Sequence, residues 1–569
     1  MLRTLVAAGL LADAHARSGT KGDPDDHCRS PRKTEVTTEV KTEVKAEVKP
    51  QVEAGAQQRA PACKKTARQV DPDGLSSPDP TTTDNPSAAQ KAKLSKRAIG
   101  GQGALLISGF AVAQACAFAR NALLGQMLSK GDFGIAATIT LTLQLVETLS
   151  DLGNDRLIVQ SRRGDEPGML ALTHLTWVVR GVILAALIYL AAGPITSLFA
   201  IPQARNAFEI AALVPLIKGF VHLDFRWHQR LLNNLPYAAY EVAPQALALC
   251  IIMPVLIIVP DFNAVPWIIL SGAVTSVVVS HACAKHPYRI ALARQYVTET
   301  LAFGWPIWLS ALPLIAVYQG DRILVGTLLG MEDLAAFTAA FMLTMVPGLL
   351  AAKVANALYL PILSAQRDDT ARFAQTFATM SEATAAVAAA YVVGFAIAGS
   401  TVLALAFGPN YAGLEHLIIA LAVMWALRMF QSVPGMALMA EGTTRPFLVA
   451  GIIRAIGLPL AAIMGFNGYG LVGMAWAGVV AEAASLIYVV LRIGLRDGGL
   501  GRAMQRPVAL LAGVCAVASA LAVMEPWTTH AATQHQSVTV IALAVFAAIL
   551  VAAGFTLTGR HLRSALAIK

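Results

Sequence analysis

Apolar residues dominate the chain from Gly101 onward, in long blocks separated by short polar loops. Each block holds about 20 to 26 residues, the length with which an α-helix crosses the hydrocarbon core of a bilayer. The pattern predicts an all-α, polytopic membrane protein with about fourteen transmembrane helices. Their approximate limits are 101–125, 133–156, 169–194, 207–226, 237–259, 265–285, 302–327, 333–357, 381–407, 413–437, 445–465, 469–493, 506–525 and 537–558.

The first 95 residues differ from this region in composition. They are rich in Pro, Thr, Asp, Gln and Lys and contain the degenerate repeat TEVTTEVKTEVKAEVKPQV at 34–52. Valine at every fourth position makes a poor apolar stripe, so 1–95 is predicted to be a disordered, low-complexity cytoplasmic tail. Residues 1–18 imitate a signal peptide. Two interpretations stay open: a cleaved signal, which would invert the orientation derived below, and a tolerated or wrongly assigned extension.

Composition and charge agree with a membrane protein. Of the 569 residues, 56% are hydrophobic and 14% are charged, whereas a soluble domain averages about 45 to 50% and about 25%. The net charge is +9, and the basic residues lie mainly in short loops. That distribution is typical of cytoplasmic anchoring, and we expect no nucleic acid partner. None of the six cysteines forms a Cys-x-x-Cys pair, so we expect neither a metal site nor a disulfide framework.

Lysine and arginine set the expected orientation. If the N-terminus is cytoplasmic, the outer loops hold little besides Lys130 and Arg205. This asymmetry places both termini inside. The short outer loops leave no room for an extracytoplasmic catalytic or receptor domain. The basic residues expected on the inner side are Lys91, Lys93, Lys96, Arg97, Arg162, Arg163, Arg230, Arg289, Arg294, Arg367, Arg372, Arg445, Arg496, Arg502, Arg560 and Arg563.

Two segments about 200 residues apart align with each other. They are NALLGQMLSKGDFGIAAT at 121–138 and RILVGTLLGMEDLAAFTA at 322–339, and Gly125 aligns with Gly326. Each copy joins the first helix of a six-helix group to its second helix. An even number of helices separates the copies, so they share one orientation. The alignment predicts two parallel lobes with the substrate path at their interface.

The same segments carry a family resemblance. The stretches 119–160 and 301–344, with the motifs LYLP at 358–361 and FGPNY at 407–411, resemble bacterial oligosaccharide flippases of the multidrug/oligosaccharidyl-lipid/polysaccharide (MOP) exporter superfamily. The resemblance covers about 95–569. It implies two six-helix lobes and two additional helices. The corresponding segments are 96–285, a linker at 286–301, 302–493 and 494–569.

The resemblance also implies a function. Proteins of this kind translocate polyprenyl-diphosphate-linked oligosaccharide across the bacterial inner membrane by alternating access, for O-antigen, capsule or exopolysaccharide assembly. The implied partners are this lipid-linked substrate, the lipid bilayer, a polysaccharide polymerase and glycosyltransferases. No cofactor is implied.

Cations inside the predicted helices are the candidate substrate-binding residues. Each needs a partner, a water-filled cavity or a route to the interface, and a diphosphate with attached sugars needs a hydrated, cationic path. Alternatively, the deeper cations form structural ion pairs with Glu482 or Glu241. The candidate lining residues are Arg120, Lys353, Arg428, Arg454 and Arg322.

Arg120 is the cation that the resemblance singles out. Related lipid carrier flippases have an Arg-acid pair on the first helix, where the Arg is thought to meet the pyrophosphate. In this sequence Asn121 replaces the acid. The alternative is that Arg120 extends to the outer head groups.

Acidic residues in the predicted helices form a second candidate group. Glu147, Asp151 and Asp155 recur at four-residue spacing, which on one continuous helix stacks three carboxylates on one face. We consider a proton or sodium site that drives transport and, alternatively, a structural network with Arg156 or another helix. The further acidic candidates for either role are Asp321, Glu241 and Glu482.

Two features concern movement between the lobes. Proline and glycine inside predicted helices mark candidate hinges, because proline removes an intrahelical hydrogen bond. The interlobe segment KHPYRIALARQYVTET at 285–300 alternates cations with apolar residues and is expected to form an amphipathic helix along the inner head groups. The candidate hinge residues are Pro306, Pro347, Gly348, Pro434 and Gly435.

Three classes of function compete. The leading hypothesis is the flippase described above. The nearest alternative is another MOP transporter, either a multidrug exporter, for which we expect a mostly apolar or acidic cavity, or a peptidoglycan-precursor flippase. A membrane-integral glycosyltransferase, ligase or polymerase is disfavoured because the outer loops are short. No metal-ligand spacing, Gly-rich phosphate loop or nucleophile elbow is found, so we predict no catalytic residues and no enzyme.

Overall fold

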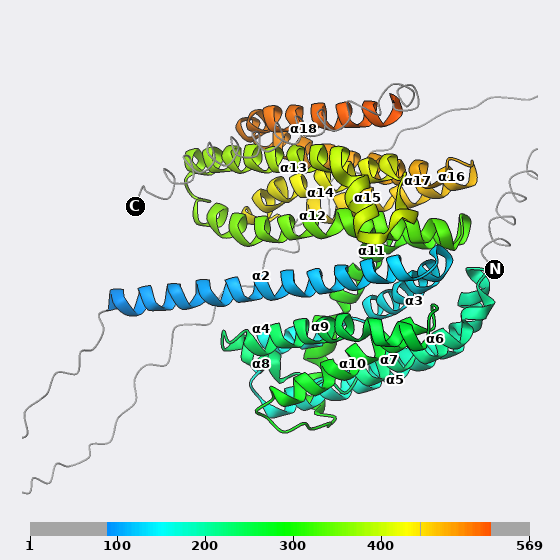
Figure 1. Ribbon diagram of the computed structural model, residues 1–569. Coiled ribbons are helices and arrows are strands. Elements are labelled where there is room, and N and C mark those ends of the chain that lie inside the picture. The colour runs from blue at the N-terminus through cyan, green and yellow to red at the C-terminus, as the bar shows by residue number, and fades with distance from the viewer. Residues whose placement is uncertain (1–87, 444, 525–569) are drawn as a thin grey trace, which may run out of the picture. The chain divides into compact units, whose positions relative to one another are not determined.

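A computed structural model describes residues 88–443 and 445–524, and all regular structure in these residues is helical (Figure 1). The helices are α2 (Ala88–Met127), α3 (Lys130–Leu149), α4 (Asn154–Gln160), α5 (Pro167–Leu198), η1 (Pro202–Ala204), α6 (Arg205–Ala211), α7 (Leu213–Lys218), α8 (Asp224–Arg230), α9 (Leu235–Ile258), α10 (Ala264–Ala282), η2 (Arg294–Tyr296), α11 (Val297–Leu328), α12 (Met331–Ala365), α13 (Thr370–Phe407), η3 (Pro409–Tyr411), α14 (Glu415–Ala440), α15 (Arg445–Ala455), α16 (Gly457–Phe466), α17 (Gly470–Arg496) and α18 (Gly498–Met524).

These helices make a multi-pass membrane protein. Ten spans among the described residues are long and apolar enough to cross a bilayer, and the bent pair α3 and α4 adds an eleventh if it is one span. Large apolar side chains cover the surface: Leu190, Ile258 and Leu495 are 77%, 80% and 81% exposed. Lipid rather than water accommodates such a surface. The predicted all-helical membrane fold is therefore confirmed. Of the predicted spans, 537–558 lies outside the described residues, so the count of fourteen stays a prediction.

Two predicted spans are interrupted where proline removes a backbone hydrogen bond. The expected helix at 207–226 is divided into α6 and α7 at Ala212, and it ends at Lys218. Pro215 has no N–H for the carbonyl of the residue four positions earlier, which opens the helix at this point. The span at 445–465 is divided in the same way between α15 and α16, before Pro459.

The predicted repeat is visible in the helix boundaries. Helix α2 ends at Met127 and α3 begins at Lys130, while α11 ends at Leu328 and α12 begins at Met331. The two junctions pack against each other, and a side chain at Gly134 would collide with the backbone carbonyl of Met331. We call this side of the protein the junction end, and the opposite side, where residues 283–296 lie, the linker end.

The second lobe is built around α14. This helix packs against α12, α13 and α17, and most of its residues are buried. Trp425 and Phe430 are among the largest fully buried side chains. In the first lobe α2 packs along α9, and it also touches α12 and α13 of the second lobe (Figure 1).

Helix α11 contacts both lobes. Near its start Gly304 lies against Leu152, and near its end Gly320 lies against Leu458 of α16. The helix is continuous from Val297 to Leu328. It contacts the first lobe near both of its ends, since Gly326 lies against Phe199, and the second lobe at Leu458.

The candidate hinge residues lie within continuous helices. Pro306 is in α11, Pro347 and Gly348 are in α12, and Pro434 and Gly435 are in α14. None of these helices is divided at its proline, in contrast to the two interrupted spans. Their role as hinges stays a prediction.

The interlobe segment differs from the predicted amphipathic helix. Residues 284–293 form no helix, and only the short η2 precedes α11. The backbone N–H of Lys285 donates to Asp224 Oδ2 at 2.7 Å, and His286 Nδ1 lies 2.6 Å from Asp224 Oδ1. The expectation of a helix is wrong because Pro287 interrupts the segment and the first lobe supplies other partners to its backbone.

A cluster of rings covers the start of this segment. His174, His222 and His281 surround Tyr288, with ring centroids 4.4, 5.5 and 5.0 Å from the Tyr288 ring. His222 Nε2 lies 2.9 Å from the carbonyl oxygen of His286. These histidines come from α5, the turn before α8 and α10, so sequence spacing gave no signal of the cluster.

A second anchor holds the end of the segment. Tyr296 donates a hydrogen bond to Glu166, and Arg163 Nε lies 3.1 Å from the same carboxylate. The guanidinium of Arg163 also lies 4.3 Å from the centroid of the Tyr296 ring. The hydrogen bonds from Tyr296 and then Arg163 favour the ionised form and lower the pKa of Glu166 below its usual range.

We predict that Asp224→Ala destabilises the protein. Asp224 is fully buried and accepts hydrogen bonds from the linker backbone, and each buried group left without its partner costs about 1–3 kcal/mol. The apparent unfolding temperature in detergent should fall. Asp165→Ala is the control, because Asp165 is exposed and has no partner among the described residues. Equal unfolding temperatures for the two variants would contradict the anchoring role of Asp224.

Candidate functional site

Three helices of the second lobe bring two of the predicted cations to one carboxylate. Arg428 of α14 donates from Nε to Glu482 Oε1 at 2.8 Å, and Arg454 Nε of α15 lies 3.1 Å from Glu482 Oε2. Glu482 of α17 is 2% exposed. The predicted alternative, a pairing of these arginines with Glu482, is therefore what the structure shows.

Polar side chains extend this arrangement. Arg454 Nη2 donates to Gln431 Oε1 at 2.7 Å, Gln431 Nε2 donates to Ser485 Oγ at 2.9 Å, and Ser485 Oγ donates to the carbonyl oxygen of Ala450 at 3.1 Å. The chain of bonds joins α14, α15 and α17. Such a network fixes the positions of both guanidinium groups.

The cluster retains an excess of positive charge. Arg428 and Arg454 share the single carboxylate of Glu482, and Arg428 Nη1 is buried with no hydrogen-bond partner among the described residues. Arg428 also packs on the rings of Tyr318 and Trp425, at 4.8 and 4.7 Å from their centroids. The Nη1 amino group of this arginine is therefore buried without a hydrogen-bond acceptor among the described residues.

Arg322 and Asp321 border the same cluster. Arg322 is 7% exposed and its guanidinium lies 4.5 Å from the centroid of the Phe341 ring. Asp321 interacts electrostatically with both Arg322 and Arg428. The structure thus joins three of the five predicted cations in one region of the second lobe.

The other two predicted cations lie elsewhere. Arg120 Nη1 donates to Gln245 Oε1 of α9 at 2.9 Å, so this guanidinium has a partner within the first lobe. Lys353 is exposed, and its Nζ lies 3.1 Å from the centroid of the Phe110 ring on α2. Lys353 also interacts electrostatically with Glu241 of α9. Lys353 is therefore a cation of the second lobe that contacts the first lobe.

The predicted carboxylate ladder is not formed on one helix. Helix α3 ends at Leu149, and α4 continues at an angle of 50°. Gly153 has φ +63°, which favours glycine, and its N–H donates to Asp151 Oδ1 at 2.8 Å. The prediction of a continuous helix over 133–156 is wrong because this turn rotates Asp155 away from Glu147.

Each carboxylate of this group has its own cation. Glu147 Oε1 lies 2.8 Å from Lys218 Nζ. The ion pairs Asp151–Arg156 and Asp155–Arg226 measure 2.9 and 2.6 Å. These pairs remove the repulsion expected among like charges. They match the structural network that was the alternative to a proton or sodium site.

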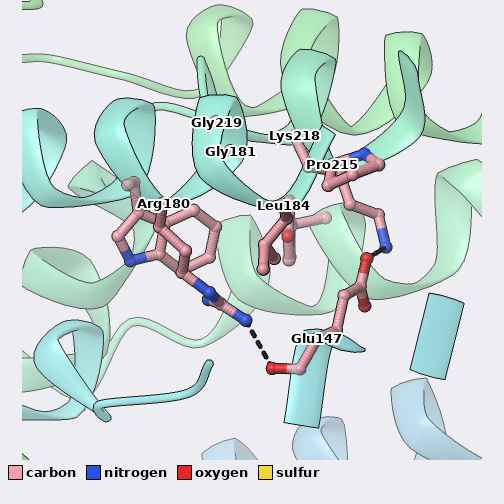
Figure 2. A pocket seen from close by; sticks show the side chains of 9 residues that line it. Glu147, Arg180, Gly181, Leu184, Pro215, Lys218 and Gly219 are labelled. Carbon is pink, nitrogen blue, oxygen red and sulfur yellow. Dashed lines mark hydrogen bonds and ion pairs between the residues drawn. The ribbon is translucent and has the colours of Figure 1, made fainter. Parts of the chain in front are cut away.

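The Glu147 pair lines a small cavity of the first lobe. Its volume is about 110 Å³. Figure 2 shows Arg180 and Lys218 approaching Glu147 from two sides. Arg180 Nη2 donates to the backbone carbonyl of Glu147 at 2.7 Å, and Arg180 Nε donates to Ser150 Oγ at 2.8 Å. The sequence analysis did not connect Arg180 or Lys218 to Glu147.

The described residues offer no obvious metal site. No group of three or more His, Cys, Asp or Glu side chains within them is arranged to hold a metal ion. The four cysteines in this part of the chain are free.

Comparison with known proteins identifies the family. A family model described as polysaccharide biosynthesis protein matches residues 123–416, more than half of the chain. The chain belongs to this family. No curated protein matches the sequence significantly. The match includes both of the repeated helix junctions.

Solved structures of transporters share the fold of this chain. A lipid II flippase, MurJ, in an inward closed conformation matches with a TM-score of 0.62 and 13% sequence identity, over 80% of this chain and 99% of that chain. An inward-facing multidrug resistance MATE family transporter of the MOP superfamily matches with a TM-score of 0.53 and 18% identity, over 67% of this chain and 95% of that chain. The expected fold is confirmed: this chain shares it with a protein named a flippase and with a named transporter of the MOP superfamily.

We predict that Glu482→Gln destabilises the second lobe. Removing one partner from a buried ion pair costs about 3–5 kcal/mol, because the remaining charge is left uncompensated. Thermal unfolding in detergent should begin at a lower temperature than for Glu382→Gln, which changes an exposed carboxylate on α13. A Glu482→Gln variant as stable as the wild type would show that the two arginines do not depend on this carboxylate.

Proposed function

We propose that this protein is a flippase for polyprenyl-diphosphate-linked oligosaccharide in the bacterial inner membrane. The observation that carries the proposal is the match to polysaccharide biosynthesis proteins, on a fold shared with a protein named a lipid II flippase. The flipped oligosaccharide serves O-antigen, capsule or exopolysaccharide assembly. Glycosyltransferases supply it on one side of the membrane, and a polymerase uses it on the other.

The charges inside the membrane support this substrate class. A diphosphate cannot cross hydrocarbon without compensating charge and hydrogen bonds. Arg428 and Arg454 outnumber the carboxylate between them, and one N–H group of Arg428 has no partner among the described residues. Arginine forms strong, charge-assisted hydrogen bonds with phosphate oxygens. We assign a substrate-lining role to this cluster, to Arg322 beside it, and to Lys353 and Arg120.

Lys353 is the best placed of these for the first contact with substrate. It is exposed, it belongs to the second lobe, and it contacts Phe110 of the first lobe. A cation at the boundary between lobes can bind a diphosphate without first breaking a buried ion pair. Arg428 and Arg454 would have to share their bonds with Glu482, so we place them later along the path.

The proposed orientation puts the linker end in the cytoplasm. Arg162, Arg289, Arg367 and Arg445 all lie in loops or helix starts at this end, which agrees with the positive-inside rule. With the predicted span at 537–558 included, both termini are then cytoplasmic. In the proposed alternating access, the lobes separate at the junction end while they close at the linker end, and then close at the junction end while they separate at the linker end.

A multidrug exporter and a peptidoglycan-precursor flippase are the competing proposals. Both are represented among the proteins of the same fold. The cationic cluster favours an anionic lipid substrate over a cationic drug. It does not separate the oligosaccharide substrate from a peptidoglycan precursor, because both carry a diphosphate.

The decisive test combines deletion and reconstitution. Deleting the gene should cause polyprenyl-diphosphate oligosaccharide to accumulate on the cytoplasmic face. Proteoliposomes with the purified full chain should flip this lipid, and should leave a lipid II substrate and a cationic dye unmoved. Normal surface polysaccharide without accumulation would reject the flippase. Preferential movement of lipid II or of the dye would establish the corresponding alternative.

We predict that Lys353→Gln slows flipping and Lys353→Arg preserves most of it. A hydrogen bond to a charged group contributes about 1.5–3 kcal/mol, so the rate in proteoliposomes should fall by a factor of about ten to a hundred. Arg367→Gln is the matched control, because Arg367 is an exposed cation just beyond α12, the helix that holds Lys353. Equal rates for Lys353→Gln and this control would remove Lys353 from the path.

A further inference from the structure

A pocket at the linker end of the second lobe does not belong to the charge clusters described above. It lies between the loop that joins α14 to α15 and the last turns of α17, and its volume is about 520 Å³. Arg445 and Arg492 line it together with Leu438, Pro446 and Leu495. Its size is within the range of small-molecule and lipid head-group sites.

The side chains of the two arginines are unpaired within the described residues. Both are exposed, and neither has an ion pair, hydrogen bond or ring contact from its side chain to the other described residues. Asp497, the carboxylate next along the chain from α17, instead accepts from the backbone of Gly499 at 2.7 Å and caps α18. Glu441 has an interaction of its own. The pocket thus presents two positive charges to a ligand.

The start of α15 adds to the positive field. Arg445 is its first residue, and no acidic residue stands in its first turn. The N–H groups of a first helical turn lack intrahelical partners and carry a partial positive charge. With two arginines beside it, this helix end favours an anion such as a phosphate group.

The loop that forms one wall is held in place. Gly442 has φ +78°, and the backbone N–H of Thr443 donates to the carbonyl oxygen of Leu438 at 2.9 Å. The Thr443 hydroxyl donates to the same carbonyl at 2.9 Å. This closes the end of α14 with a glycine in the left-handed conformation. The pocket is therefore formed before any ligand binds.

The surroundings indicate a lipid rather than a free anion. The pocket lies where three spanning helices end, and Leu495 on its wall is 81% exposed. Leu491 and Leu448 on the same helices are 58% and 62% exposed. A basic pocket between transmembrane helices at the level of the head groups, with apolar side chains towards the bilayer, suits an anionic phospholipid.

We propose that this pocket binds the phosphate head group of an anionic phospholipid, with Arg445 and Arg492 as its ligands. The acyl chains lie along the apolar faces of α15 and α17. The bound lipid covers the joint between α14, α15 and α17, the three helices that meet at Glu482. This site is distinct from the flippase path, and its test measures lipid binding rather than transport.

The experiment is native mass spectrometry of the full chain titrated with phosphatidylglycerol or with phosphatidylcholine of the same acyl chains. The wild type should retain phosphatidylglycerol more tightly. A basic residue near an anionic lipid changes affinity about fivefold, so Arg445→Gln with Arg492→Gln should weaken retention about 25-fold. Retention equal to that of the wild type would overturn the proposal.

Two further variants separate the explanations. Arg162→Gln with Arg367→Gln removes two exposed arginines elsewhere at the linker end and should leave retention unchanged; an equal loss would mean a general charge effect and no site. Leu495→Glu, which adds a negative charge to the pocket, should weaken retention without touching either arginine. Inorganic phosphate at millimolar concentration should not displace the lipid, and displacement would mean that the pocket is a free-phosphate site instead.

Discussion

Charge inside hydrocarbon is the constraint on which the rest of this structure depends. An ionised side chain in a spanning helix costs a few kcal/mol unless another charge or a hydrogen bond compensates it. The compensation in each lobe joins helices that are distant in sequence. In the second lobe Glu482 connects α14, α15 and α17, and in the first lobe Glu147 connects α3 with α5 and α7. Each lobe is thereby held by polar bonds between its helices as well as by apolar packing.

The cations of the second lobe fall into two groups, one fixed by buried partners and one exposed. Arg428 and Arg454 are fixed by their carboxylate and by a chain of hydrogen bonds. Their positions are set in advance, which lowers the cost of organising a site around a charged ligand. Lys353 is exposed, and among the described residues its side chain contacts the Phe110 ring and feels the charge of Glu241. The proposed path begins with an exposed cation and continues past fixed ones, an order that suits a head group that has to be captured and then released.

The sequence predicted the large-scale organisation well, because that organisation follows from periodic apolar blocks. The junctions at Leu128-Ser129 and Leu329-Gly330 occupy equivalent places in the two repeats, as the alignment indicated. Ion-pair partners were harder to predict. Spacing alone suggested that Glu147 and Asp155 share a helix face, whereas the left-handed conformation of Gly153 separates them.

The missed features share a physical cause. The pairing of Lys218 with Glu147, and the cluster of histidines around Tyr288, join residues from several helices whose relative rotation is set by packing. The interlobe segment has the alternation of an amphipathic helix, yet Asp224, a buried residue of the preceding lobe, binds its backbone more favourably. Tertiary contacts of this kind leave no trace in local periodicity.

Helix α11 packs against both lobes. Its first turns lie against Leu152 of the first lobe, and its later turns lie against Leu458 of the second lobe and Phe199 of the first. A rotation of one lobe relative to the other would therefore have to be absorbed along this helix. Pro306 and Pro313 both lie in it. Because proline lacks the N–H that would stiffen the helix, we expect bending of α11 to be concentrated in the roughly two turns between these prolines, and the stiffness of those turns would then limit how far and how fast the two lobes swing.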